Sequence, residues 1–388
     1  MNKNIQINKL SLNLATSLLA IVLIVVILFF TQTIVLPILF SIILAVMVYP
    51  IAKLLENLKF NRTFSTIFSL LLAILLFTGI SYLIIMQVID ISKDAAAIID
   101  KLQVLSNDTL KWITKTFQIS QNELADKALK ELEQGLSTIS KYAMTFFSSF
   151  GSVLTSGILV PIFAFFFLYY RDFFKSFFIK AFKSTPQEKV EDTLKKMYDA
   201  LQNYMLGQLT VMAIVAILNT IGLYLIGLEY AWFFGVLASL LMILPYVGIA
   251  IGSIFPAIFA LATMDSPYYA LGIVGWFQVV QFLEGNFITP NIVGGKVSLN
   301  PMVSMLAIIL GGMLFGFAGF ILALPIAALL KVVFDSIPQL ESFGYLLGDP
   351  EIENKKMKEQ EQELENNIEV LPETTDDSVL EDESSKEE

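Results

Sequence analysis

The chain has 388 residues, of which 56% are hydrophobic and 15% charged, and its net charge of −10 comes from the acidic segment 351–388. A soluble domain has about 25% charged residues, so this composition indicates a polytopic membrane protein. The chain has no cysteine or histidine, which excludes disulfides, thiolate nucleophiles, Cys/His metal sites and imidazole acid–base chemistry.

Residues 1–89 contain three apolar stretches, Leu12–Phe30, Ile34–Leu55 and Phe64–Ile89, which predict three transmembrane spans. The first run is longer than the apolar region of a secretory signal peptide, so we expect it to be retained. Residues 90–145 form a polar insert whose apolar residues recur at helical spacing. This pattern favours an extracytoplasmic helical hairpin over a ligand-binding domain.

Residues 146–204 predict a fourth span followed by a cytoplasmic amphipathic helix. We interpret residues 205–345 as a transport core, in which two continuous spans, Met205–Ile226 and Tyr268–Ile288, alternate with two broken apolar stretches. The segment 346–388 has too little apolar content for a packed core, so it is expected to be a disordered, acidic cytoplasmic tail.

The broken stretches, Tyr230–Met264 and Pro301–Asp335, are each too long for one membrane crossing and too short for two. Each therefore predicts two half-depth arms joined by a bend. Helix breakers interrupt both, and we expect those of the second stretch to act in packing or as a hinge: Gly311, Gly312, Gly316, Gly319 and Pro325. The predicted fold is an all-α polytopic membrane protein with about eight membrane elements.

Two topologies remain open for this third of the chain. If both broken stretches cross fully, Lys296 lies outside, whereas two re-entrant hairpins keep Lys296 and Lys331 inside. Positively charged short loops tend to stay cytoplasmic, which favours hairpins and puts both termini in the cytoplasm. Each hairpin with its preceding span then forms a unit, and the two units have opposite orientation, as in the inverted repeats of secondary transporters.

Polar residues cluster at the end of the Tyr268–Ile288 span. Gln278, Gln281 and Glu284 are spaced to lie near one face of a helix, and Glu284 is the only carboxylate between Asp265 and Asp335. A charged group at bilayer depth costs ~2.5–3.5 kcal/mol on insertion scales and usually serves function. Glu284 is therefore the candidate for proton or cation coupling, and the alternative is a position near the membrane interface.

Further candidate substrate- or ion-binding residues lie on either side of Glu284 in the sequence. They are Asn286, Thr289, Pro290 and Asn291 after it, and Pro245, Tyr246 and Gly248 at the first break, where carbonyl groups freed before a proline can bind a cation. Asn203, Gln208 and Asn219, in or near the fifth span, are interpreted as structural, because one interhelical hydrogen bond each would satisfy them.

Several of these motifs together resemble the autoinducer-2 exporter family of bacterial membrane proteins. They are Leu244-Pro245-Tyr246-Val247-Gly248, the run from Glu284 to Gly294, Leu299-Asn300-Pro301, and the glycine-rich run from Gly311 to Pro325. The resemblance extends from residue 12 to about 340. It implies roughly eight membrane elements, a multi-pass protein of the bacterial cytoplasmic membrane, and a site centred on Glu284, Asn286, Pro290 and Asn291.

Members of that family are linked to export of autoinducer-2, and some to sodium/proton antiport. The leading hypothesis is therefore a secondary transporter for a small polar solute, coupled to a proton or sodium gradient, with sodium/proton antiport as one alternative. A passive channel or a membrane scaffold is an alternative of another class. The sequence contains no nucleotide-binding motif and no motif of an intramembrane enzyme, so an enzyme is not expected.

The predicted partners are the lipid bilayer and a small polar solute, a proton or sodium, with no cofactor and no nucleic acid. A glycine-rich membrane-facing surface is also compatible with a homo-oligomer.

Overall fold

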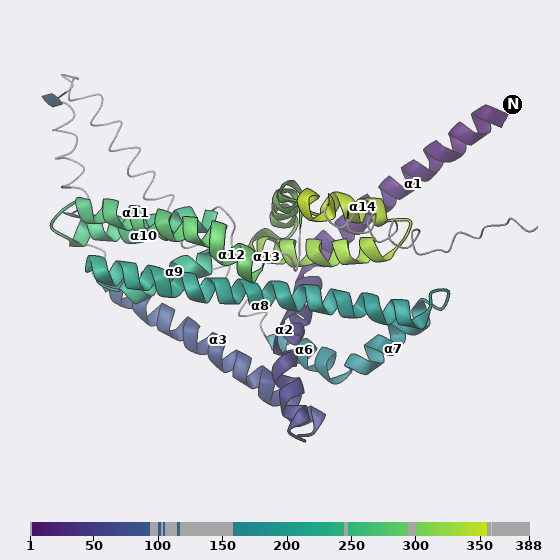
Figure 1. The fold of residues 1–388 in the computed structure, drawn as a ribbon, viewed down its shortest axis with the longest axis horizontal. Coiled ribbons are helices and arrows are strands. Elements are labelled where there is room, and N and C mark those ends of the chain that lie inside the picture. The colour runs from purple at the N-terminus through teal and green to yellow at the C-terminus, as the bar shows by residue number, and fades with distance from the viewer. Residues whose placement is uncertain are drawn as a thin grey trace, which may run out of the picture.

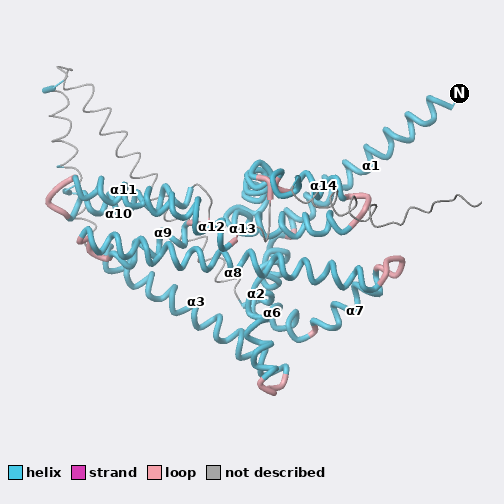
Figure 2. The backbone as a smooth tube through the Cα atoms, viewed as in Figure 1, coloured by secondary structure: helices cyan, strands magenta, loops and turns pink. Residues whose placement is uncertain are grey.

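The structure, a computed structural model, describes residues 2–93, 158–243, 247–293 and 299–354, with a few isolated positions besides. All the secondary-structure elements named in these residues are helices, and Figures 1 and 2 show their arrangement. The predicted all-α fold is therefore confirmed. Almost all of the predicted insert, 90–145, and most of the predicted acidic tail lie outside the described residues.

The first three helices coincide with the three predicted spans. They are α1 (Asn2–Phe30), α2 (Gln32–Asn57) and α3 (Arg62–Lys93). Both α2 and most of α3 are long and apolar enough to cross a membrane. Apolar side chains such as Leu75 of α3 are widely exposed, as expected of a surface that contacts lipid. Buried residues of α2 and α3 pack with α6 (Leu159–Tyr169) in a small core that includes Ala45 and Ala164.

A single helix of 40 residues, α8 (Gln187–Ile226), forms the axis of the molecule. It joins the predicted cytoplasmic helix and the fifth span without a break, and the short α7 (Arg171–Ala181) precedes it. Gly227 ends α8 with a φ of 86°, the left-handed conformation that glycine adopts without strain. Later helices pack along α8, including α9, α11, α12 and α13 (Figure 1).

The first broken stretch is a helical hairpin of α9 (Ala231–Leu241) and α10 (Val247–Thr263). Glycines allow its arms to touch: a Cβ on Gly248 would overlap the carbonyl oxygen of Leu241, and one on Gly252 would lie 2.9 Å from the Cβ of Ala238. The bend itself, with Pro245 and Tyr246, lies outside the described residues.

The second broken stretch, α13 (Pro301–Ser336), folds back at Gly316. This residue has φ 57° and ψ −134°, which is not a helical conformation. Beyond it, a Cβ on Gly319 would overlap the carbonyl oxygen of Gly311. In a straight helix these two residues would be ~12 Å apart along the axis. Gly316 thus makes the bend, while Gly311 and Gly319 let the two arms touch.

The first arm of each hairpin is short compared with a bilayer. At 1.5 Å per residue, α9 is ~16 Å long and the arm before Gly316 is ~22 Å long, whereas the hydrocarbon core is about 30 Å thick. By length and composition alone α13 qualifies as a span, but its fold at Gly316 returns it toward its starting side. The geometry therefore favours two re-entrant hairpins over two full crossings.

The first hairpin packs beside the C-terminal half of α8, and α11 (Tyr268–Leu283) packs against both of them. Their shared core contains Leu223 of α8, Phe234 of α9 and Phe259 of α10, with Ile273 of α11 fully buried. The second hairpin lies along a different part of α8 (Figure 1). The polar end of α11 lies between the two hairpins along the chain.

The residues after the second hairpin pack back onto it. The ammonium group of Lys331 pairs with Asp335 at 2.7 Å and with Glu353 at 3.1 Å. The backbone N–H of Asn300 donates to the carbonyl oxygen of Leu347 at 2.8 Å. Helix α14 (Glu341–Leu347) lies between these contacts. Ordered packing thus continues past residue 346, where the sequence suggested that the disordered tail begins.

Gly316→Ala should destabilise the protein by about 1–3 kcal/mol, because a Cβ is strained at this backbone conformation. The check is thermal unfolding of the purified protein, where the variant should melt several degrees lower. Gly272→Ala is the matched control, since Gly272 is helical and a Cβ there meets no atom within 4 Å. An equal effect of the two changes would contradict the role of Gly316 in the bend.

The cysteine-free chain allows the hairpin topology to be tested with one introduced thiol. Asp265→Cys, in the exposed turn after α10, should react with an impermeant thiol reagent added outside intact cells, because a re-entrant hairpin returns Asp265 to the outer side. Lys59→Cys, in the turn between α2 and α3, should react only after lysis. Protection of Asp265→Cys until lysis would instead indicate a full crossing.

Candidate functional site

A π-helical turn, Glu284–Ile288, interrupts the helix between α11 and α12 (Thr289–Ile292). Hydrogen bonds in a π-helix run to the fifth residue along, and such turns are frequent at functional sites. Here the turn brings Thr289 under Glu284: the Thr289 hydroxyl donates to one carboxylate oxygen, and Gln281 Nε2 donates to the other at 2.7 Å. The Glu284 carboxylate is therefore held by two donors, one on each oxygen.

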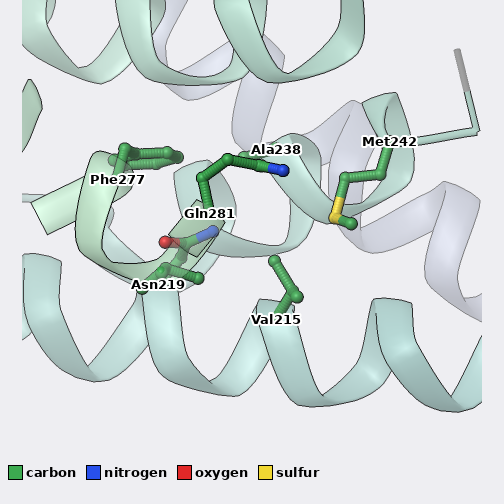
Figure 3. A pocket seen from close by; sticks show the side chains of 7 residues that line it. Val215, Asn219, Ala238, Met242, Phe277 and Gln281 are labelled. Atoms are coloured by element: carbon green, nitrogen blue, oxygen red, sulfur yellow. The ribbon is translucent and has the colours of Figure 1, made fainter. Parts of the chain in front are cut away.

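Gln281 also lines a cavity between three helices (Figure 3). The cavity is walled by Val215 and Asn219 from α8, Ala238 and Met242 from α9, and Phe277, Val280 and Gln281 from α11. Both amide side chains reach this space, while the rest of the wall is apolar. The cavity has room for about one water molecule, so it is too small to hold a solute in this conformation.

Asn219 is the most unusual residue of this cavity. Its side chain is 2% exposed, and its Oδ1 atom has no hydrogen-bond partner within the described part of the chain. An unsatisfied buried acceptor costs about 1–3 kcal/mol, so its persistence needs an explanation. A ligand or water that donates to Oδ1 in the cavity would satisfy it.

The cavity lies at the break of the first hairpin. Met242 is the first residue after α9, and Ala238 contacts Gly252 of the other arm. A change in the angle between the arms would therefore alter the cavity wall directly. Gly248 belongs to this packing and not to the cavity lining, and the neighbouring Pro245 and Tyr246 lie outside the described residues.

The structure brings together three of the sequence-predicted site residues, Gln281, Glu284 and Thr289. The others are placed elsewhere: Asn286 and Asn291 donate to carbonyls of their own helical segment, at Phe282 and Phe287. All four remaining members of the predicted cluster are exposed: Gln278, Asn286, Pro290 and Asn291.

Sequence reasoning assigned Asn219 a structural role, and its position beside Gln281 gives it a place in the candidate site. The available signal was an asparagine deep in an otherwise apolar span. Which helix it faces could not be read from the sequence, because α8, α9 and α11 meet through tertiary packing. In the described part of the chain, no group of three or more acidic, cysteine or histidine residues is arranged to hold a metal ion.

Comparison with known proteins gives the wider context of this architecture. YueF of Bacillus subtilis, named as a candidate transport protein, is 28% identical over 324 residues, which cover 80% of this chain and 86% of YueF. YrrI of the same organism, similarly named, is 36% identical over 140 residues, which are 36% of this chain and 39% of YrrI. The AI-2 transport protein TqsA of Escherichia coli is 24% identical over 156 residues, covering 40% of this chain and 45% of TqsA.

The matched stretch thus spans less than half of YrrI and of TqsA, but most of YueF. The family model described as AI-2E family transporter matches residues 18–339, which include every helix from α2 to α13. The helices with exposed apolar surface, the two hairpins and the polar site between them all lie within that match. The chain belongs to the AI-2E family of membrane transporters.

Proposed function

We propose that this protein is a secondary transporter that exports a small polar solute of the autoinducer-2 type, coupled to a proton or sodium gradient through Glu284. The observation that carries the proposal is the link from the Glu284 carboxylate through Gln281 to the cavity where Asn219 Oδ1 has no partner among the described residues. The name of TqsA supports the substrate class.

Gln281 gives a physical route from ion binding to solute binding. Its amide nitrogen can only donate, so it bonds Glu284 Oε2 while that oxygen is an acceptor. A proton placed on Oε2 turns this oxygen into a donor, so the Gln281 amide has to rotate and accept with its side-chain oxygen instead. Its NH2 group, next to Asn219, would then be free to donate to a polar solute.

Sodium would act on the same bond by a related route. A cation bound to Oε2 competes for the lone pairs that Gln281 Nε2 uses, and the Gln281 side-chain oxygen could turn to coordinate it. The Thr289 hydroxyl, which can donate or accept, can remain bound to Glu284 in either state. Proton or sodium arrival would therefore loosen one hydrogen bond and leave the other intact.

Transport of a solute requires the cavity to become larger. Because it has room for about one water, a solute can enter only if a wall shifts. The first hairpin supplies two wall residues, Ala238 and Met242, and near these residues its arms meet through glycine contacts. We expect this hairpin to move against α8 and α11, as rigid repeats do in secondary transporters.

Replacing Glu284 by Gln should abolish gradient-driven flux in proteoliposomes while the protein still folds and inserts. Glutamine fills the same volume but cannot bind a proton or neutralise a cation. The measurement is solute efflux with and without imposed proton and sodium gradients. If the variant shows the same coupled flux as the unchanged protein, Glu284 has no part in the mechanism. If the unchanged protein exchanges ions but carries no solute, a sodium/proton antiporter is favoured.

Asn219→Leu should reduce solute flux by at least about tenfold, which corresponds to 1.4 kcal/mol of lost binding in the transport cycle. Leucine keeps the branched shape of asparagine, its added bulk can extend into the adjacent cavity, and it removes the unsatisfied acceptor, so thermal stability should hold or rise. Gln278→Leu is the matched control, because Gln278 is an exposed amide on the same helix as Gln281. Equal flux in the two variants would contradict a role for Asn219 in the site.

A further inference from the structure

Helix α7 carries a row of phenylalanines, three of which are exposed in the described chain. Phe173, Phe174, Phe177 and Phe178 recur at the spacing of one helix face. None of them is buried, and only Phe174 is partly covered, by its contact with Phe167 of α6. Phe173 is 68% exposed and Phe177 is 55% exposed. Figure 1 shows α7 at the edge of the molecule, where it leads from α6 back to α8.

Lysines flank this aromatic face. On a helical projection Lys175 and Lys180 fall on its two sides, and Lys183 follows the end of the helix. Lys175 pairs with Glu191 of α8 at 2.9 Å. In the described part of the chain Lys180 and Lys183 have no ion pair, so their charges are available to an external anion.

Two ion pairs fix the beginning of α7 at the ends of apolar helices. The Arg171 guanidinium donates to both carboxylate oxygens of Glu56, near the end of α2, at 2.9 and 2.6 Å. Arg62, the first residue of α3, donates to Asp172 at 2.7 Å, and this bond holds the pKa of the Asp172 carboxyl below its usual value. α7 therefore starts at the level where α2 ends and α3 begins.

We propose that α7 lies in the membrane interface, with its phenylalanine face among the acyl chains and Lys180 and Lys183 on the headgroups of anionic phospholipids. Amphipathic helices with aromatic residues on one side and lysines beside them bind membranes in this way. α7 starts beside the bilayer, because it follows α6 and adjoins α2 and α3, which are apolar helices. Charge complementarity selects the anionic headgroup, since basic residues next to the membrane are attracted to anionic lipid.

The position of the aromatic face can be measured with the full chain in proteoliposomes of phosphatidylcholine and phosphatidylglycerol. Phe177→Cys and Ser176→Cys, each bearing a spin label, place one probe on the phenylalanine face and one on the polar side of α7, about 100° apart, in a cysteine-free background. We expect the label at 177 to be relaxed mainly by oxygen, which concentrates in the bilayer, and the label at 176 mainly by a water-soluble nickel complex. Nickel access at 177 equal to that at 176 would overturn the proposal.

A second experiment tests the preference of α7 for anionic headgroups. Changing both Lys180→Gln and Lys183→Gln in the Phe177→Cys protein should raise nickel access at the label, and so should removing phosphatidylglycerol or adding salt. Lys189→Gln, an exposed lysine of α8, is the control and should change nothing. If the label is fully protected from nickel in pure phosphatidylcholine, the proposed binding to anionic headgroups is wrong. If it is protected in detergent and crosslinks to another chain, the phenylalanine face binds a protein partner instead of lipid.

Discussion

Peptide groups inside a bilayer must find hydrogen-bond partners within the protein, and this constraint shapes the C-terminal third of the chain. A bend frees carbonyl and amide groups, so a bent element at membrane depth has to be enclosed by its neighbours. The two hairpins meet this demand with glycines, since Gly248 and Gly319 bring one arm against the backbone of the other. The arms then shield each other, and the first hairpin, with α8 and α11, encloses a small cavity whose wall is apolar except for two amides.

The polar site depends on this enclosure in a second way. Gln281 and Asn219 face a cavity whose remaining walls are apolar, so few competing polar groups surround them. The π-helical turn then places Glu284 where Gln281 and Thr289 can both reach its carboxylate. A regular helix would carry Thr289 away from Glu284, because five residues span almost one and a half turns.

Much of this architecture could be predicted from the residues. Hydropathy identified the spans, and the glycines and prolines located the two breaks, because such residues are placed where a membrane helix bends. Glu284 was predicted as a site residue because a carboxylate next to an apolar span is rare, and its role stays a prediction. Gln278 was expected on the same face, but helical steps of three residues drift by about 60° each, which puts Gln278 and Glu284 about 120° apart. The position of Asn219 beside Gln281 depends on the packing of three helices, so periodicity alone could not reveal it.

The unbroken length of α8 has a mechanical consequence. At 40 residues it is roughly 60 Å long, about twice the thickness of the hydrocarbon core. Its first turns are fastened to α7 by the Lys175–Glu191 pair, and Asn219 stands near its far end. Because α8 continues without a break, a tilt of its first turns would also displace Asn219. Movement at one end of the helix would in this way be transmitted to the other end.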